Sequence, residues 1–252
     1  MPSDVDLHIS VSDVAVGFDG RALLEHLNFE VRRGEVFMVL GGSGCGKSTV
    51  LRHLIGFDQP MHGQILVDGE PPELGDDPPR CGVLFQSGAL FGSLTLAQNV
   101  ALPLETWTDL TRAEIAEIVR SKLRLVGLGG FENHVPAELS GGMKKRAGIA
   151  RALALEPPLV YLDEPSAGLD PITSAELDEL ILTLSRSLGM TLVIVTHELA
   201  SIFAIGQRCI MLDREAKGII ATGDPRELRD HSTDPRVAAF FNRRPPAGEA
   251  RA

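Results

Sequence analysis

A glycine-rich segment at residues 41–48, GGSGCGKS, constrains the fold of this chain more than any other feature. It fits the pattern G-x-x-x-x-G-K-[ST], which requires a buried strand before it and a helix after it. Residues 36–40 are apolar without interruption, and apolar residues recur at helical spacing over residues 50–55. We therefore predict a strand–loop–helix unit here, rather than a glycine-rich turn that only starts a helix.

The predicted loop has the chemistry of a phosphate site. Its glycines let backbone N–H groups converge on phosphate oxygens, and the N-terminus of the following helix adds a partial positive charge. Lys47 would reach the β- and γ-phosphates of a nucleotide, and the Ser48 hydroxyl would hold Mg²⁺. The residues expected to contact the nucleotide here are Gly41, Gly42, Ser43, Gly44, Cys45, Gly46, Lys47, Ser48 and Thr49.

Two adjacent carboxylates follow a second apolar run, at residues 159–162. Asp163 and Glu164 would stand at the carboxyl end of a buried parallel strand, where ligands bind in such sheets. We expect Asp163 to hold Mg²⁺ and Glu164 to polarise a water molecule for attack on the γ-phosphate. A solvated helix cap would also place two acids here, and a nucleotide kinase would also use the phosphate loop. The carboxylate beside the metal ligand favours water as the nucleophile.

The hydrophobic periodicity predicts an α/β fold. Apolar residues alternate over residues 7–31, which is typical of an antiparallel sheet. Residues 36–40, 159–162 and 191–195 are apolar at successive positions, which is typical of a mostly parallel core sheet. Residues 87–155 have a helical pattern, so we expect a helical subdomain inserted in the core.

Local signals mark some of the expected helices. Thr111 with Glu114 and Thr173 with Glu176 form two capping boxes, which predict helix starts. The basic run at residues 144–146 is expected on the solvated face of a helix.

The charge balance and composition disfavour several classes of protein. The chain has 24 Lys and Arg against 34 Asp and Glu, a net charge of −10, which argues against indiscriminate binding to nucleic acid. Its apolar runs fall short of the roughly 18 residues of a membrane-spanning helix. The acidic first ten residues do not resemble a signal peptide, and the three cysteines are too far apart for a disulfide framework or zinc site. We expect a cytoplasmic protein that binds no nucleic acid.

Residues 139–143, LSGGM, resemble the signature motif of ATP-binding-cassette (ABC) ATPases. Other motifs of that family are present in the expected order along the chain. Gln86 stands where the family has its Q-loop, residues 166–170 resemble the D-loop, and His197 resembles the switch histidine. Phe18 resembles the aromatic residue that stacks on adenine.

The resemblance covers residues 5–225, as a single ABC ATPase domain of the P-loop NTPase fold. It implies a mostly parallel core sheet, an N-terminal antiparallel β subdomain and a helical signature subdomain at residues 87–155. Residues 226–252 would be a C-terminal extension, which from residue 243 onward has the composition of a loose tail.

The resemblance further implies a homodimer that closes head-to-tail around two ATP molecules with Mg²⁺. Each ATP would lie between the Lys47 loop of one copy and Ser140, Gly141 and Gly142 of the other, so the signature would complete the site in trans. Asp170 is also implied at the nucleotide. ATP binding would favour the closed dimer, and hydrolysis would allow it to open.

Gln86 and His197 join Glu164 as implied catalytic residues, and Gln86 is also an implied Mg²⁺ ligand. Structural interpretations remain open for several of these residues. Phe18 would also fit the last inward position of its strand, His197 a cap of the next helix, and Ser140 an N-cap.

Two classes of ABC ATPase fit these motifs: the energising subunit of a membrane transporter, and a soluble ATPase of DNA repair, chromosome organisation or translation. The soluble types split the cassette with coiled coils or zinc modules, or carry two cassettes in one chain, and this sequence shows neither. We therefore expect a transporter subunit that binds permease subunits on the inner face of the cytoplasmic membrane. Phe91, close to Gln86, would contact the permease or belong to the helical core.

Within transporters, the chain is most similar to the Mla/Mce-type phospholipid and toluene-tolerance ATPases. The similarity rests on Met143, residues 85–91 and the late segment 234–236 with Phe240 and Phe241. It implies transport of phospholipids or other hydrophobic envelope compounds, an Mce-domain substrate-binding protein and a small accessory regulatory protein. Another small substrate is the alternative. Phe240 and Phe241 would lie in a disordered end or dock on the neighbouring subunit.

Overall fold

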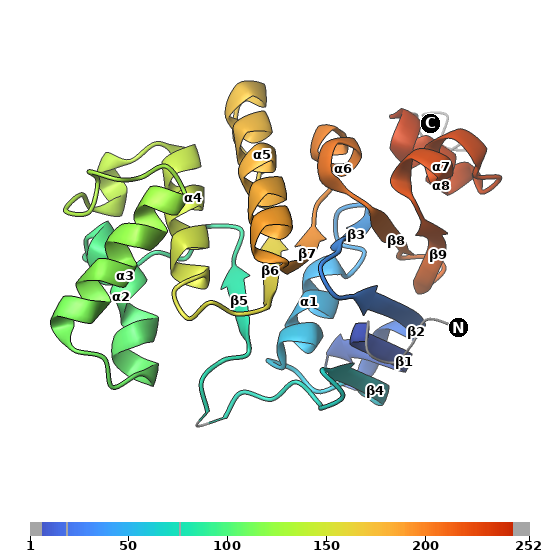
Figure 1. Cartoon of the computed structure of the whole chain (residues 1–252). Coiled ribbons are helices and arrows are strands. Elements are labelled where there is room, and N and C mark those ends of the chain that lie inside the picture. Colours follow the sequence, from blue (N-terminus) through green and yellow to red (C-terminus); the bar gives the residue numbers. More distant parts are fainter. Residues whose placement is uncertain (1–6, 19, 76, 244–252) are drawn as a thin grey trace. The chain divides into compact units, whose positions relative to one another are not determined.

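The computed structural model describes residues 7–18, 20–75 and 77–243. The chain divides into two compact units. Figure 1 shows the ribbon with its helices and strands labelled. Unit 1 comprises Met1–Glu73 and Val193–Ala252, and unit 2 comprises Leu74–Leu192. Both units combine strands with helices, which confirms the α/β class.

Unit 1 begins with an antiparallel sheet in the strand order β2-β1-β4. Its strands are β1 (Leu7–Phe18), β2 (Arg21–Arg32) and β4 (His62–Val67). Along β2, the side chains of Leu27, Phe29 and Val31 are buried and the residues between them are exposed. One face of this sheet is therefore buried, as the alternating pattern predicted.

A second sheet of unit 1 carries the strand that precedes the glycine-rich loop. In it, β3 (Val36–Gly41) pairs in parallel with β8 (Arg208–Asp213), and β8 pairs antiparallel with β9 (Gly218–Gly223). The strand β7 (Thr191–Val195), which ends in unit 1, neighbours β3 on its other side. All six residues of β3 are buried, as the uninterrupted apolar run predicted for a strand covered on both faces.

The helices α1 (Lys47–Ile55) and α6 (Leu199–Ile205) also belong to unit 1. The helix α1 follows the glycine-rich loop directly and ends at Gly56, whose φ of 92° lies in the left-handed region. Glycine reaches this conformation without steric strain, and it is common just after the last turn of a helix.

Unit 2 contains the acidic strand and the helices expected around it. The strand β5 (Cys81–Leu84) pairs in parallel with β6 (Leu159–Asp163). The helices are α2 (Leu96–Trp107), α3 (Arg112–Leu125), α4 (Gly141–Ala152) and α5 (Pro171–Leu188), with a 3₁₀ turn at Pro136–Glu138. Three of the helices, α2, α3 and α4, lie between β5 and β6 in sequence and pack on one another, which confirms the inserted helical segment.

One of the two predicted helix starts is correct. At α3, the Thr111 side chain accepts the Glu114 N–H in a complete capping box. The start of α5 was placed wrongly: the helix begins at Pro171, and the Asp170 carboxylate accepts the N–H of Thr173 at 3.1 Å. Proline suits the first helical position and aspartate is a strong N-cap, so together they start the helix before Thr173.

Two short helices end the described part of unit 1, namely α7 (Pro225–His231) and α8 (Pro235–Asn242). Phe241 of α8 is buried, and its ring centroid lies 5.7 Å from that of Phe203 in α6. Phe241 therefore packs within its own unit. The loose tail expected beyond residue 243 lies outside the described residues.

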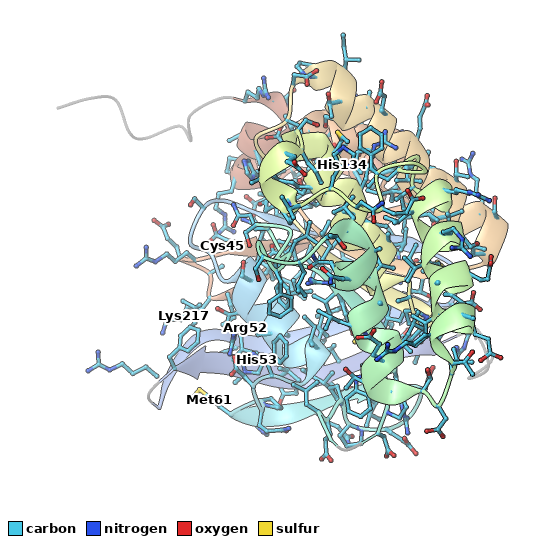
Figure 2. The ribbon with its side chains drawn as sticks, turned by 90° about the vertical axis from the view of Figure 1, so that its left-hand side faces the viewer. Cys45, Arg52, His53, Met61, His134 and Lys217 are labelled. Carbon is cyan, nitrogen blue, oxygen red and sulfur yellow. The ribbon has the colours of Figure 1, made fainter. Side chains whose placement is uncertain are left out.

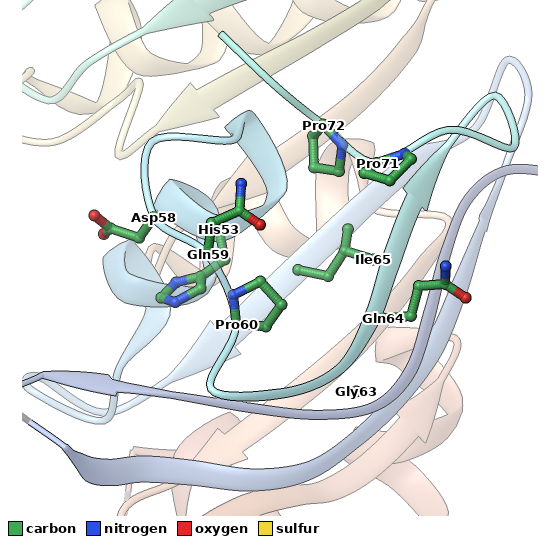
Figure 3. A pocket seen from close by; sticks show the side chains of 9 residues that line it. All are labelled: His53, Asp58, Gln59, Pro60, Gly63, Gln64, Ile65, Pro71 and Pro72. Atoms are coloured by element: carbon green, nitrogen blue, oxygen red, sulfur yellow. The ribbon is translucent and has the colours of Figure 1, made fainter.

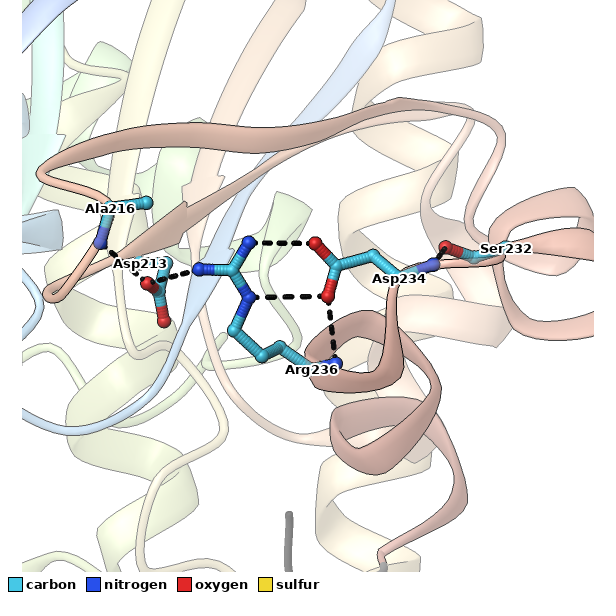
Figure 4. A network of polar contacts seen from close by, with 5 residues as sticks. All are labelled: Asp213, Ala216, Ser232, Asp234 and Arg236. Atoms are coloured by element: carbon cyan, nitrogen blue, oxygen red, sulfur yellow. Dashed lines mark hydrogen bonds and ion pairs between the residues drawn. The ribbon is translucent and has the colours of Figure 1, made fainter. Parts of the chain in front are cut away.

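A network of polar contacts fixes the start of α8 (Figure 4). The Arg236 guanidinium donates to Asp213 Oδ1 at 2.9 Å and to Asp234 Oδ2 at 2.7 Å. The Asp213 carboxylate also accepts the Ala216 N–H at 2.8 Å. These bonds connect α8 to the turn between β8 and β9, because Asp213 ends β8.

Candidate nucleotide-binding site

The glycine-rich loop of unit 1 connects β3 to α1, as predicted. Gly46, the N-cap of α1, has a φ of 106°, in the left-handed region that other residues rarely adopt. A Cβ atom at Gly41 would lie 2.5 Å from Cys45 Sγ and from the carbonyl oxygen of Leu212. The tight turn of the backbone therefore requires glycine at both positions.

The ammonium group of Lys47 folds back over this loop. Its Nζ donates to the carbonyl oxygens of Gly41 at 2.9 Å and Gly42 at 3.0 Å, and the residue is buried. These bonds use two of the three N–H donors of the ammonium group. A positive charge is thus held beside the backbone that is expected to receive phosphates.

Cys45 lies inside the loop, just before α1 (Figure 2), with only 3% of its surface exposed. Burial raises the pKa of its thiol, so the group stays protonated at neutral pH. Cys45 therefore packs inside the loop as a small neutral side chain.

Two further predicted site residues of unit 1 are exposed. Phe18 ends β1 with 55% of its surface exposed, so the alternative that it points into the core is wrong. The side chain of His197, after β7, is also 55% exposed. The alternative that His197 caps the next helix is wrong as well, because Glu198 occupies the N-cap position of α6.

The two acids of unit 2 stand at the end of β6, as predicted. Asp163 is the last residue of this fully buried strand, and Glu164 follows it with a φ of 48°. Both residues are buried, at 9% and 7% exposure. The alternative of a solvated helix cap is therefore wrong, since these carboxylates do not face bulk water.

Lys145 of α4 connects two of the predicted site segments in unit 2. Its Nζ donates to the carbonyl oxygen of Gln86 at 2.6 Å and to that of Glu164 at 2.8 Å. Burial lowers the pKa of Lys145, and the charges of Asp163 and Glu164 oppose that shift. The prediction that residues 144–146 form a solvated face is wrong for Lys145, which is only 6% exposed.

The signature segment forms the start of α4. The Ser140 side chain is the N-cap and accepts the Met143 N–H at 3.3 Å, as its interpretation as an N-cap predicted. A Cβ atom at Gly142 would lie 2.4 Å from Thr173 Cγ2, so this glycine allows α4 and α5 to approach closely. Gly141, the first residue of the helix, is exposed.

The carboxylate of Asp170 is engaged at the start of α5. Besides its bond to the backbone of Thr173, it accepts the Thr173 hydroxyl at 2.5 Å. This side-chain bond, with the backbone N–H bonds, holds the pKa of Asp170 below its usual value. Asp170 is therefore ionised at neutral pH, and its place at the nucleotide stays a prediction.

A cavity of about 160 Å³ in unit 1 lies beside α1, and Figure 3 shows the side chains that line it. His53 forms one wall, and its Nδ1 lies 2.8 Å from the carbonyl oxygen of Thr49. Pro60, Ile65 and Pro72 contribute apolar surface. The lining residues include none of those expected to bind nucleotide, so this cavity is not part of the predicted site.

The structure therefore collects the predicted residues in two groups. Unit 1 contains the glycine-rich loop with Lys47, together with Phe18 and His197. Unit 2 contains Gln86, the two acids at the end of β6, the signature and Asp170. Within it, Lys145 bonds to the backbone carbonyls of Gln86 and Glu164.

Comparison with known proteins identifies the family. The sequence pattern of the ABC transporter family matches residues 24–167. A probable ribonucleotide transport ATP-binding protein, mkl of Mycobacterium leprae, is 42% identical over 94% of this chain and 69% of its own length. The intermembrane phospholipid transport system ATP-binding protein MlaF of Escherichia coli K12 is 39% identical over 93% of this chain and 88% of its own length.

A solved structure is also similar. It is the ATP-binding cassette MJ0796, determined as a dimer in a post-hydrolysis state with ADP and Pi. Its TM-score is 0.76, with 30% sequence identity over 86% of this chain and 98% of the MJ0796 chain. Among the helices described here, none is both long and apolar enough to cross a membrane. The chain belongs to the ABC transporter family and is an ATP-binding, ATP-hydrolysing subunit of that family.

Proposed function

We propose that this subunit drives a transporter of phospholipids or other hydrophobic compounds of the cell envelope. The observation that carries this proposal is the similarity to MlaF, which extends over 93% of this chain and 88% of that protein. A match of this extent includes the segments outside the common ATP-binding motifs. The second candidate substrate is a ribonucleotide, because mkl, at 42% identity, carries that description.

ATP binds at the loop between β3 and α1. Among the residues that the structure describes, no side chain caps the start of α1, and its first N–H groups would bind the phosphate oxygens. Lys47 turns its ammonium group from the carbonyls of Gly41 and Gly42 toward the β- and γ-phosphates. Phe18, exposed at the end of β1, offers an aromatic face to adenine.

Mg²⁺ would accompany the nucleotide, and Ser48, Gln86 and Asp163 are the residues that would hold it. A hydroxyl, an amide and a carboxylate are all oxygen donors, the type that this cation prefers, so the residues present fit it. The bound ion would neutralise negative charge on the β- and γ-phosphates.

Glu164 acts as the general base for the attacking water, with Gln86 and His197 orienting the reacting groups. Glu164 is buried, and it directly follows the last residue of a fully buried strand. Rigid support of this kind favours catalysis, because a general base must lie within hydrogen-bond reach of the proton that it takes.

A homodimer completes each site. The helix start at Ser140, Gly141 and Gly142 of one copy faces the γ-phosphate bound by the other, and Asp170 lies at the same interface. The dimer of MJ0796 with ADP and Pi supports this arrangement, since it is a related cassette at 30% identity.

The subunit works on the inner face of the cytoplasmic membrane, bound to permease subunits. Phe91 is 57% exposed, which favours a contact with the permease over a place in the helical core. An Mce-domain substrate-binding protein and a small accessory regulatory protein complete the system. Residues 5–225 form a single ABC ATPase domain with the helical subdomain at 87–155, and residues 226–252 are a C-terminal extension.

Reconstitution tests the proposal. The full chain is purified with the membrane proteins that co-purify with it and is placed in liposomes that contain labelled phospholipid or enclose labelled ribonucleotide. We expect ATP-dependent movement of phospholipid that is lost with Glu164→Gln. ATP-dependent movement of the ribonucleotide alone would overturn the lipid assignment and support the second candidate.

A further inference from the structure

Lys145 occupies an unusual place for a lysine. It is only 6% exposed, although Lys144 and Arg146 beside it in sequence are partly exposed. Removing an ammonium group from water is unfavourable unless it gains hydrogen bonds and compensating charge. Lys145 gains both, from two backbone carbonyls and from the neighbouring charges of Asp163 and Glu164.

The two carbonyls belong to segments that leave different strands. Gln86 follows β5, and Glu164 follows β6. The carbonyl oxygen of Glu164 accepts Lys145 Nζ at 2.8 Å and also the Ala167 N–H at 3.2 Å. Two groups therefore hold the backbone of Glu164: the Lys145 side chain of α4 and the Ala167 N–H in the turn that follows Glu164.

Glu164 needs such support because of its backbone conformation. Its φ of 48° lies in the left-handed region, which is unfavourable for a residue with a side chain. Conformations of this kind persist only where the surrounding structure enforces them. Here the hydrogen bonds that Lys145 and Ala167 donate to the Glu164 carbonyl hold this conformation. The direction in which the Glu164 side chain leaves the backbone depends on that conformation.

Other contacts fix the helix α4 against β5 and the segment that follows this strand. A Cβ atom at Gly148 would lie 2.5 Å from Leu84 Cδ1, so the helix approaches this strand closely. Arg151 donates to the carbonyl oxygen of Ala89 at 2.6 Å. Through Lys145, the helix α4, which these contacts hold against β5 and Ala89, is also connected to Glu164.

We propose that Lys145 is a positioning residue for ATP hydrolysis, which holds Glu164 in place by joining its backbone to that of Gln86 through α4. This inference rests on the proposed role of Glu164 as the general base. Lys145 touches neither nucleotide nor water in this role. It acts through the position of Glu164, so its loss reduces turnover and leaves ATP binding intact.

The test compares Lys145→Met with Lys122→Met in the full chain. Lys122 is a matched control, because it is also a buried lysine of unit 2, 8% exposed, but its Nζ contacts Glu156 Oε1 at 2.6 Å. For Lys145→Met we expect a kcat about 10- to 100-fold lower, the range that small misplacements of catalytic groups produce. The Kd for ATP should stay within about threefold of the wild-type value, because the contacts that hold ATP in the ground state are retained. Lys122→Met should change neither quantity.

Hydrogen exchange in the nucleotide-free chain gives an independent measurement. Peptides that contain residues 86–89 and 164–168 should exchange faster in Lys145→Met, and peptides from β1 and β2 should not change. Lys145→Arg, which keeps a cation with several donors, should restore slow exchange and most of the turnover. Unchanged kcat and exchange in Lys145→Met, equal losses in Lys122→Met, or no recovery in Lys145→Arg would each overturn the proposal.

A parallel Glu164→Gln sample separates this proposal from the assignment of the base. Normal turnover by Glu164→Gln would show that the base assignment is wrong, whereas the exchange measurement would still report whether Lys145 holds the Glu164 backbone.

Discussion

The Nζ atom of Lys47 lies 2.9 Å from the carbonyl oxygen of Gly41, the residue that ends β3. A second bond of 3.0 Å to the Gly42 carbonyl keeps the ammonium group over the loop. Because the lysine is already ordered beside the loop, it loses little conformational freedom when phosphates replace the carbonyls as its partners.

Lys47→Ala should therefore weaken ATP binding rather than the fold. Bonds to charged groups contribute about 1.5–3 kcal/mol each, which corresponds to a Kd about 10- to 100-fold higher. Titration with a fluorescent ATP analogue measures the change. Lys217→Ala removes the same charge from an exposed position of unit 1 and should leave the Kd unchanged. Equal effects of both variants would mean that net charge alone controls binding.

Glu164→Gln should abolish steady-state hydrolysis while ATP still binds. General-base catalysis contributes about 10²- to 10⁴-fold, and the amide cannot take the proton from water. Because ATP then persists in the site, the closed dimer should accumulate, which size-exclusion chromatography with ATP detects. Wild-type turnover by this variant would refute the general-base assignment.

The sequence predicted the site best where local chemistry determines the structure. The glycine-rich loop and the Thr111 capping box depend on neighbouring residues, and both are where the pattern placed them. The buried strand that ends at Asp163 is also correct, since uninterrupted apolar residues are typical of a strand covered on both faces.

The burial of Lys145 could not be predicted in the same way. Its partners Gln86 and Glu164 lie 59 and 19 residues away in sequence, and both contribute only backbone carbonyls, which every residue has. The one available signal was spacing, because Lys145 precedes the small Gly148 by three residues and shares its face of α4. The start of α5 was missed for another reason: Asp170 and Pro171 form a stronger helix start than the Thr173 box.

The composite site can be tested with two inactive variants. Ser140→Arg places a bulky cation at the start of α4, and Lys47→Ala damages the phosphate loop. Each variant alone should be inactive as a homodimer. A mixture should recover part of the wild-type hydrolysis, because the mixed dimer contains one site with an intact Lys47 loop and an intact Ser140. Activity no greater than the sum of the separate variants would argue against completion in trans.

Gly82→Ala should destabilise unit 2. A Cβ atom at Gly82 of β5 would lie 2.3 Å from the carbonyl oxygen of Ala152 in α4, and backbone cannot move aside as a flexible side chain can. Overpacking of this kind costs about 1–3 kcal/mol, measured here as a lower free energy of unfolding in urea. Gly92→Ala, where a Cβ atom meets nothing within 4 Å, should stay within about 0.5 kcal/mol of wild type.

Phe241→Ala should loosen the packing of α8 in unit 1. The Phe241 side chain is 4% exposed, and its ring packs on Phe203 at 5.7 Å and edge-on against Phe240 at 5.3 Å. Removing a buried phenyl ring costs about 3–5 kcal/mol, and a helix of this length is not stable without packing, so amides of α8 should exchange faster with solvent hydrogen.

Phe240→Ala separates packing within the unit from docking on a neighbouring subunit. Phe240 is only partly buried, so its loss should leave the exchange of α8 nearly unchanged. If Phe240 docks on the second copy, the variant should instead weaken the ATP-bound dimer formed in the Glu164→Gln background, because the ring's apolar contact surface is lost from that interface. Analytical ultracentrifugation measures this dissociation constant. A dimer of unchanged affinity, with α8 still protected, would show that Phe240 contributes nothing to the interface.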